Sequence, residues 1–189
     1  MVVLFKCVLI GDGAVGKTSL RERFLGKGFK ANYLITIGAD FALANKRIGE
    51  TNVKFQIWDL AGQSRFGDIR PIYYKKALGG LVVFDCTRPS SFKNLDSWIE
   101  ECWTHNGQGE IPLVILGNKS DLKAKEANYV TNEQAQLFAE QISQKTEPFG
   151  FKVPYLETSA KTALNVERAF ESLGLMVLKF VEEKRAEGN

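Results

Sequence analysis

The sequence predicts an α/β fold, with a mostly parallel six-stranded sheet, one antiparallel strand and helices on both faces. Apolar runs rich in β-branched residues alternate along the chain with amphipathic helical patterns, which is typical of parallel sheets covered by helices. The first of these runs leads through a glycine-rich turn into a helical pattern, as a strand–turn–helix unit does. The expected strands are residues 2–10, 41–48, 53–58, 81–86, 113–116 and 153–156, and the expected helices are residues 19–25, 91–103, 131–143 and 165–184.

Local signals support individual elements. The run 41–48 pairs with 53–58 as an antiparallel hairpin across the turn Gly49-Glu50-Thr51-Asn52, whereas the other strands are separated by helices. Thr131 and Gln134 have the spacing of a capping box at the start of the helix 131–143. In such sheets ligands bind at the carboxyl ends of the strands, and every motif described below follows a strand.

Length and composition indicate one domain, which we expect to span residues 1–185, with 186–189 as a short C-terminal remnant. The chain has 189 residues, 44% of them hydrophobic and 25% charged, and a net charge of +3. This charge is too small to favour nucleic acid as a partner, and no apolar run approaches the ~20 residues of a membrane span. The three cysteines, Cys7, Cys86 and Cys102, lack metal-ligand spacing, which predicts buried thiols in a reducing compartment.

The stretch 11–18 reads GDGAVGKT, the pattern G-x-x-x-x-G-K-T of a phosphate-binding loop (P-loop). Glycines at such a turn let the backbone approach phosphates, and the following helix N-terminus favours negative charge. Lys17 supplies a point charge for the β- and γ-phosphates, and the Thr18 hydroxyl is a hard oxygen suited to Mg²⁺. The residues expected at the nucleotide are Gly13, Ala14, Val15, Gly16, Lys17, Thr18 and Ser19.

A second motif follows the strand 53–58. Asp59 stands at its carboxyl end, where a carboxylate facing the phosphate loop can hold Mg²⁺ through a water. Gly62 can present its backbone N–H to the γ-phosphate, and Gln63 is then placed to orient an attacking water.

Two further motifs predict recognition of guanine. After the strand 113–116, the Asp121 carboxylate can accept hydrogen bonds from guanine N1–H and its exocyclic amine, a donor pair that adenine lacks. Asn118 can tie this loop to the phosphate loop, and Lys119 can cover the base. After the last strand lie Ser159, Ala160, whose N–H can donate to guanine O6, and Lys161, which can pack along the base.

With these motifs in place, the chain resembles the Ras superfamily of small GTPases from about residue 4 to about residue 179, and within it the Rab family. The Rab-like stretches are residues 37–41, 54–59, 65–66, 73–77 and 82–87. The resemblance implies a small G domain of the P-loop nucleoside triphosphatases, with GTP or GDP and Mg²⁺ as ligands. It also implies that Thr36 reaches the Mg²⁺ and the γ-phosphate, that Phe29 packs edge-on to guanine, and that Tyr33 closes over the phosphates.

The resemblance further implies a switch that hydrolyses GTP slowly, with Gln63, Lys17, Thr36 and Gly62 as catalytic residues. An exchange factor, an activating protein and effectors would bind through residues 27–41 and 60–77, and we expect a monomer that regulates vesicle traffic. The first of these segments has little periodicity, which suits an element ordered by a ligand. Arf-, Rho-, Ran- and heterotrimeric-type relatives each have a feature that this chain lacks.

Departures from the family leave alternatives open. Leu60 and Ser64 replace the usual threonine and glutamate, and the connection 144–152 is longer than in Rab proteins, which predicts a solvated loop. The chain contains no lipidation motif. It therefore predicts a cytoplasmic protein, peripheral at a membrane only if a lipidated tail is missing. An unattached signalling or prokaryotic Ras-like GTPase, and a GTP-binding interaction module with irrelevant hydrolysis, are alternatives, and an ATPase is disfavoured by Asp121.

Several other side chains are assigned structural or surface roles. The tryptophans Trp58, Trp98 and Trp103 are expected to pack, although Phe41, Trp58 and Tyr74 match an exposed aromatic effector patch of Rab proteins. His105 is expected at the surface. Arg65 and Arg70 follow Gln63, and we expect them to be exposed or to pair with a partner protein rather than to stabilise transition-state charge in cis.

Overall fold

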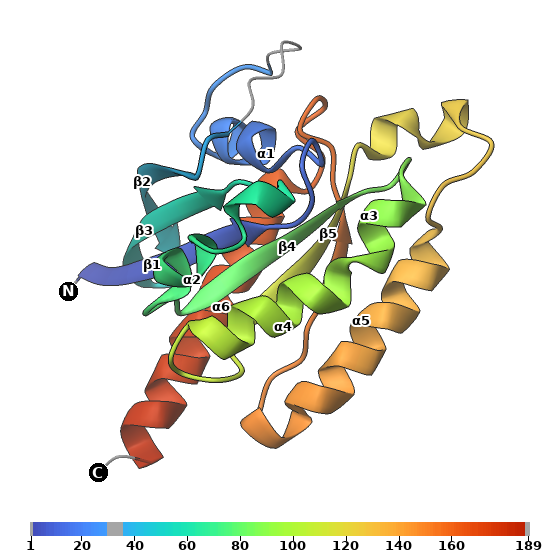
Figure 1. Cartoon of the computed structure of the whole chain (residues 1–189). Helices are drawn as coiled ribbons and strands as arrows, with labels where there is room; N and C mark the ends of the chain where they lie inside the picture. The colour runs from blue at the N-terminus through green and yellow to red at the C-terminus, as the bar shows by residue number, and fades with distance from the viewer. Residues whose placement is uncertain (1, 30–35, 188–189) are drawn as a thin grey trace.

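The computed structural model describes residues 2–29 and 36–187 and has the six-stranded sheet expected from the sequence. The strands are β1 (Val2–Ile10), β2 (Ala39–Ile48), β3 (Thr51–Leu60), β4 (Gly79–Asp85), β5 (Leu113–Asn118) and β6 (Tyr155–Glu157). Their order in the sheet is β2-β3-β1-β4-β5-β6, and only the β2–β3 pair is antiparallel. The carboxyl ends of β1, β3, β4, β5 and β6 therefore meet along one edge (Figure 1).

Helices cover both faces of this sheet. They are α1 (Lys17–Phe24), α2 (Arg70–Tyr74), α3 (Pro89–Lys93), α4 (Leu95–His105), α5 (Asn132–Thr146) and α6 (Val166–Glu187), with short 3₁₀ turns at Ser64–Phe66, Ser120–Lys125 and Glu147–Phe149. Figure 1 shows α3, α4 and α5 on one face and α6 on the other.

Two apolar cores flank the sheet because successive side chains of a strand point to opposite faces. Val8 and Ile10 of β1 join the core beneath α4 and α5. Cys7 and Leu9 join the core beneath α1 and α6, where the rings of Phe24 and Phe170 stack at 3.8 Å. All three cysteines are buried free thiols, as expected.

Three local expectations are corrected. The expected helix 91–103 is two helices that meet at Asn94, and it begins earlier because Pro89 fits a first helical turn. The hairpin turn is tighter than expected, since Ile48 pairs with Thr51. The connection 144–152 is partly helical, because α5 continues to Thr146, whose hydroxyl donates to the Phe151 carbonyl.

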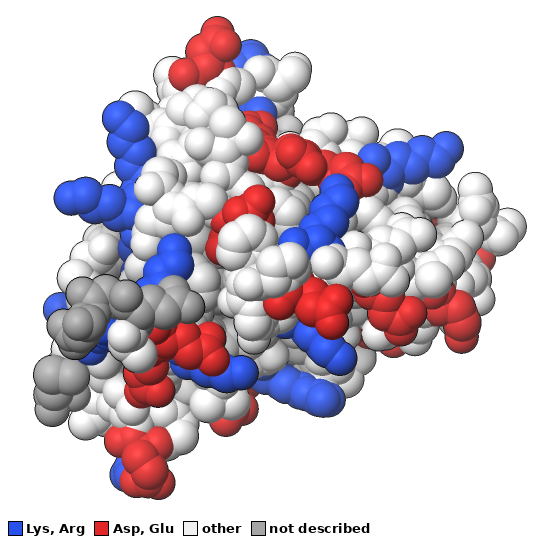
Figure 2. Space-filling view, turned by 90° about the horizontal axis from the view of Figure 1, so that it is seen from below, with Lys and Arg blue, Asp and Glu red and all other residues white. Residues whose placement is uncertain are grey.

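Other expectations are confirmed. Thr131 and Gln134 form both hydrogen bonds of a capping box. His105 is exposed at the end of α4. Among the described residues, no helix is long and apolar enough to cross a membrane. On the face of the molecule in Figure 2, basic and acidic side chains are interspersed rather than separated, in keeping with the small net charge.

Candidate functional site

The loop between β1 and α1 encloses a buried lysine. Lys17 is only 6% exposed, and its Nζ donates to the carbonyls of Gly11 at 2.6 Å and Asp12 at 2.8 Å. Burial lowers the pKa of Lys17 to about 8, although Asp59 and Asp12 oppose the shift. Desolvation disfavours the charged ammonium, so an anion bound beside Lys17 would favour that form again.

Three oxygen-bearing side chains converge beside this lysine. The Thr18 hydroxyl donates to Oδ2 of Asp59 and lies 3.1 Å from the hydroxyl of Thr36. Asp59 is fully buried, which raises its pKa, and its Oδ1 has no hydrogen-bond partner among the described residues. A buried, unpartnered carboxylate oxygen next to two hydroxyls is a donor set that suits a hard divalent cation.

Gly62 and Gln63 extend from the end of β3 across the phosphate loop. A Cβ on Gly62 would lie 2.4 Å from the Gly13 nitrogen, so only glycine permits this close approach. The Gln63 amide group lies next to Gly13, where Nε2 would be 3.6 Å from an added Cβ, and its Oε1 is buried without a partner among the described residues. The glutamine side chain is therefore held over the phosphate loop with a free acceptor.

A cavity of about 560 Å³ opens on the other side of the phosphate loop. The predicted base-binding residues Asn118, Lys119, Asp121, Ala160 and Lys161 line it together with Phe29 and Ser19. These residues come from four separate segments of the chain. The structure thus brings together at one cavity the described residues that were expected to contact the base directly. Tyr33, which was expected to close over the phosphates, lies outside the described residues.

Hydrogen bonds between loops shape this cavity. Asn118 Nδ2 donates to the Val15 carbonyl at 2.8 Å, which ties the loop after β5 to the phosphate loop. Ser159 lies beneath Asp121, and its hydroxyl donates to Oδ1 of that carboxylate at 2.5 Å. The Ala160 N–H, expected to face guanine O6, donates here to Oδ1 of Asn118 at 3.2 Å.

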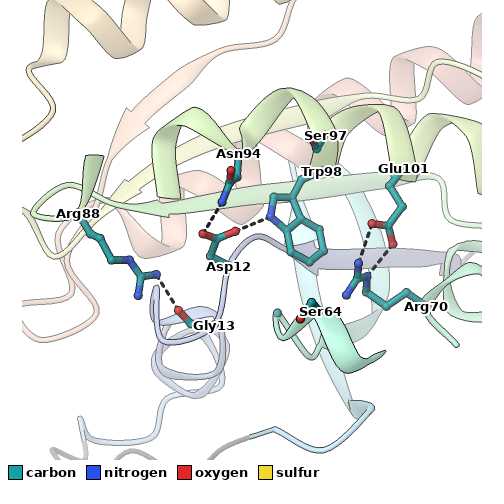
Figure 3. A pocket seen from close by; sticks show the side chains of 10 residues that line it. Asp12, Gly13, Ser64, Arg70, Arg88, Asn94, Ser97, Trp98 and Glu101 are labelled. Carbon is teal, nitrogen blue, oxygen red and sulfur yellow. Dashed lines mark hydrogen bonds and ion pairs between the residues drawn. The ribbon is translucent and has the colours of Figure 1, made fainter. Parts of the chain in front are cut away.

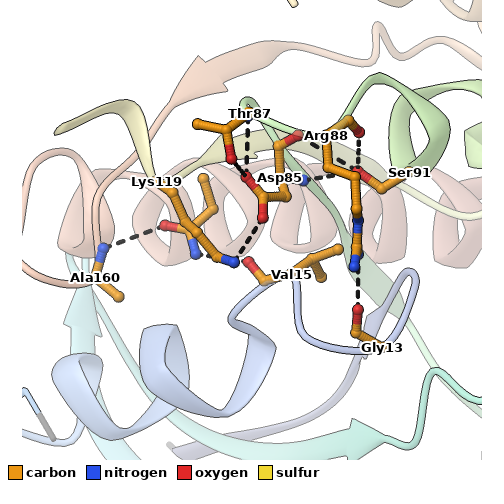
Figure 4. A network of polar contacts seen from close by, with 9 residues as sticks. Gly13, Val15, Asp85, Thr87, Arg88, Ser91, Lys119 and Ala160 are labelled. Carbon is orange, nitrogen blue, oxygen red and sulfur yellow. Dashed lines mark hydrogen bonds and ion pairs between the residues drawn. The ribbon is translucent and has the colours of Figure 1, made fainter. Parts of the chain in front are cut away.

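Residues at and just after the end of β4 also support the site, although the sequence motifs did not assign them. Asp85 pairs with the Lys119 ammonium at 2.5 Å and also accepts from Thr87. Arg88 donates to the Gly13 carbonyl at 2.7 Å. Figure 4 shows both contacts reaching across the ends of the strands. The feature of the sequence that could have identified Asp85 as a site residue is its position at the end of a strand.

A second cavity, of about 420 Å³, lies between the phosphate loop, the segment after Gln63 and α4. Trp98 Nε1 donates to Asp12 at 2.8 Å, so this tryptophan combines packing with a polar contact (Figure 3). Arg70 is buried and pairs with Glu101 at 2.6 Å within the chain, which corrects the expectation of an exposed or partner-bound arginine. Arg65 is exposed, as expected.

The aromatic patch is also corrected. Tyr74 is fully buried, whereas Tyr73 lies 5.6 Å from the Trp58 ring, which in turn lies 5.0 Å from Phe41. Adjacent residues of a short helix point in different directions. The patch is therefore formed by Phe41, Trp58 and Tyr73.

Comparisons with known proteins agree with this geometry. A family model described as the Ras family matches residues 6–179. The chain belongs to the Ras family. It is 40% identical to the Ras-related protein RABA2a of Arabidopsis thaliana over 181 residues, which are 96% of this chain and 78% of that protein. It is 39% identical to Rab-2B of Dictyostelium discoideum (95% and 83% covered) and 39% identical to Rab-13 of Rattus norvegicus (93% and 80% covered).

Membership of the Ras family, with these Rab relatives, identifies the chain as a Rab-like small GTPase. It binds guanine nucleotide and hydrolyses GTP. The residues present fit that ligand, because the buried Lys17 faces the phosphate loop and the unpaired Asp59 oxygen lies beside Thr18. The apolar and polar residues around the 560 Å³ cavity suit a purine base.

Proposed function

We propose that this protein is a Rab-like molecular switch in membrane traffic, whose two conformations are selected by GTP and GDP. The observation that carries the proposal is the convergence of Thr18, Thr36 and the unpartnered Asp59 oxygen beside Gln63. Thr36 belongs to the segment 27–41, the first switch, and Gln63 belongs to the segment 60–77, the second switch. A ligand that holds both segments would present one surface to partners, and its loss would release another.

In this proposal Asp121, assisted by Ser159, selects guanine. Lys119, Lys161 and Phe29 pack around the base, and Ala160 exchanges its contact with Asn118 for one with the base. Gly13, Ala14, Val15, Gly16, Lys17 and Ser19 cradle the phosphates. Thr18, Thr36 and Asp59 would hold Mg²⁺, which when bound supplies positive charge against the phosphate oxygens.

For hydrolysis, Gln63 orients the water, and Lys17 and the Gly62 N–H stabilise charge on the phosphoryl oxygens. No described arginine is free to serve in cis from the second switch except the exposed Arg65, so we expect an activating protein to supply that charge. The intrinsic rate should then be about 10⁻⁴ to 10⁻³ s⁻¹.

Partners would recognise residues 27–41 and 60–77. Within the described part of these segments, Phe41 and Tyr73 join Trp58 in the aromatic patch, which is the surface we expect effectors to contact. We propose that an exchange factor, an activating protein and effectors bind a cytoplasmic monomer.

Single-turnover hydrolysis of GTP by the parent chain and by Gln63→Leu tests the proposal. We expect the variant to lose most hydrolysis while it retains its affinity for GTP. Gln136→Leu, which changes an exposed glutamine of α5, is the matched control and should hydrolyse GTP at the parental rate. Parental hydrolysis in Gln63→Leu would remove the role of Gln63. Tight binding without any turnover in the parent chain would favour an interaction module.

A further inference from the structure

One face of α4 is directed at the nucleotide site. Asn94, at the start of the helix, is followed by Trp98 and Glu101, and this spacing of four and three residues places all three on one side of a helix. Asn94 and Trp98 both donate to the Asp12 carboxylate, at 2.9 and 2.8 Å. Glu101 lies one turn further on, facing the second switch (Figure 3).

Arg70 is the residue that Glu101 holds. Its Nε and Nη2 donate to the two carboxylate oxygens at 2.6 and 2.9 Å, the paired geometry that makes arginine–carboxylate contacts strong and directional. The guanidinium also lies 4.5 Å from the centre of the Trp98 ring. The Arg70 and Glu101 side chains are only 10% and 22% exposed, so solvent screens this pair less than a surface pair.

The remaining contact of Arg70 leads to the reacting groups. Its Nη1 donates to the backbone carbonyl of Gln63 at 3.2 Å, seven residues earlier in the chain. Between Gln63 and the start of α2 at Arg70, the only helical element is the 3₁₀ turn Ser64–Phe66. The backbone that carries the glutamine is therefore attached to α4 through one guanidinium.

We propose that Arg70, fixed by Glu101 and Trp98, is a positioning residue for Gln63 in GTP hydrolysis. This inference rests on the proposed role of Gln63 and adds the group that holds it. Gln63 can orient a water only if its amide stays near the phosphate, and small displacements of a reacting group are costly. The same contacts occupy Nε, Nη1 and Nη2 of Arg70, which directs the guanidinium to Gln63 rather than to the phosphoryl oxygens.

The test measures single-turnover GTP hydrolysis and the Kd values for GTP and GDP in Arg70→Ala, Arg70→Lys and Glu101→Gln. We expect the hydrolysis rate to fall about 10-fold in each, with both Kd values within about twofold of the parent. Lysine should not rescue, because an ammonium cannot form the paired contact and reach Gln63 together. The double variant Arg70→Ala/Glu101→Gln should be no slower than Arg70→Ala alone, since both changes break one unit.

Arg47→Ala is the matched control, because it removes an exposed arginine–glutamate pair on the β2–β3 hairpin and should leave hydrolysis unchanged. Equal losses of hydrolysis and nucleotide affinity would indicate a purely structural pair and overturn the inference. Should Arg70→Ala fail to fold, Glu101→Gln preserves the shape of the side chain and still decides the question.

Gln63→Leu measured in parallel separates the two proposals. If it loses hydrolysis while the Arg70 and Glu101 variants retain the parental rate, the role of Gln63 stands and that of Arg70 fails. If Gln63→Leu hydrolyses normally, the proposed mechanism itself fails.

Discussion

The two halves of the nucleotide site are stabilised in different ways. In the base-binding half, the described polar side chains bond to neighbouring loops: Asn118 to Val15, Ser159 to Asp121 and Lys119 to Asp85. In the phosphate half, oxygens of Asp59 and Gln63 are buried without partners among the described residues.

This difference separates a preassembled region from one that needs its ligand. Buried polar atoms without partners cost free energy, about 1–3 kcal/mol each, so the phosphate half becomes favourable when a ligand satisfies those atoms. In the base-binding half, the side chains already have hydrogen-bond partners on neighbouring loops. This half therefore supplies affinity and selectivity in either nucleotide state. A switch requires this division, because the protein must retain the nucleotide while its switch segments change.

Among the substitutions that test this division of the site, the largest effect is expected at Asp121. Replacement by Asn removes the acceptor of the two guanine donors, and a site built around such a pair discriminates by roughly 10⁴-fold. We expect Asp121→Asn to lose GTP affinity on that order and to prefer xanthosine triphosphate. Competition binding with the two nucleotides measures the change.

Asp96→Asn, which neutralises an exposed carboxylate on α4, is the control and should keep the parental preference. If Asp121→Asn retained the preference for guanine, another group would have to read the base, and the preassembled region would be assigned incorrectly.

A smaller effect is expected at Asp85, which holds the Lys119 ammonium. A hydrogen bond to a charged group contributes about 1.5–3 kcal/mol, and we expect Asp85→Asn to lose part of it. GDP dissociation should accelerate about 10-fold, equivalent to about 1.4 kcal/mol, with the preference for guanine unchanged. Stopped-flow release of a fluorescent GDP analogue measures the rate.

Glu167→Gln removes an exposed partner of Lys46 elsewhere on the molecule and should release GDP at the parental rate. Unchanged release in Asp85→Asn would mean that Lys119 keeps its position without this carboxylate.

The residues in direct reach of the nucleotide could be predicted from the sequence, whereas the contacts that support them could not. Sequence reasoning found Lys17, Asp59, Asn118 and Asp121 because each lies in a short motif at the end of a strand, and parallel strands bring these ends together. The sheet was also predictable, because each strand is a short apolar run that can be recognised from neighbouring residues alone. The boundary at Asn94 was not, because an uninterrupted helical pattern does not reveal a break between two helices.

The supporting contacts were not predictable because they join distant parts of the chain. Asp12 and Trp98 are 86 residues apart, and Arg70 and Glu101 are 31 residues apart. Nothing in the sequence near Arg70 shows that it will be buried. Its pairing depends on how α2 packs against α4, which no single-sequence pattern specifies.

The smallest expected effect concerns the contact between α4 and the phosphate loop. Trp98→Phe keeps an aromatic ring beneath Arg70 but removes the indole N–H that donates to Asp12. Asp12 is partly exposed and still accepts from Asn94, so we expect less than the full value of a hydrogen bond to a charged group, a loss of about 1 kcal/mol. In a chain of this size this corresponds to a fall in Tm of about 2–4 °C.

Thermal unfolding without nucleotide measures this effect, and GTP hydrolysis should fall less than about threefold because the ring still supports Arg70. A replacement that also removes the ring, Trp98→Ala, should slow hydrolysis as Arg70→Ala does, with little change in GDP affinity. If both tryptophan variants lowered only Tm, α4 would stabilise the fold without positioning Gln63. If Trp98→Phe alone slowed hydrolysis 10-fold, the indole–Asp12 contact, rather than the ring, would link α4 to the catalytic half.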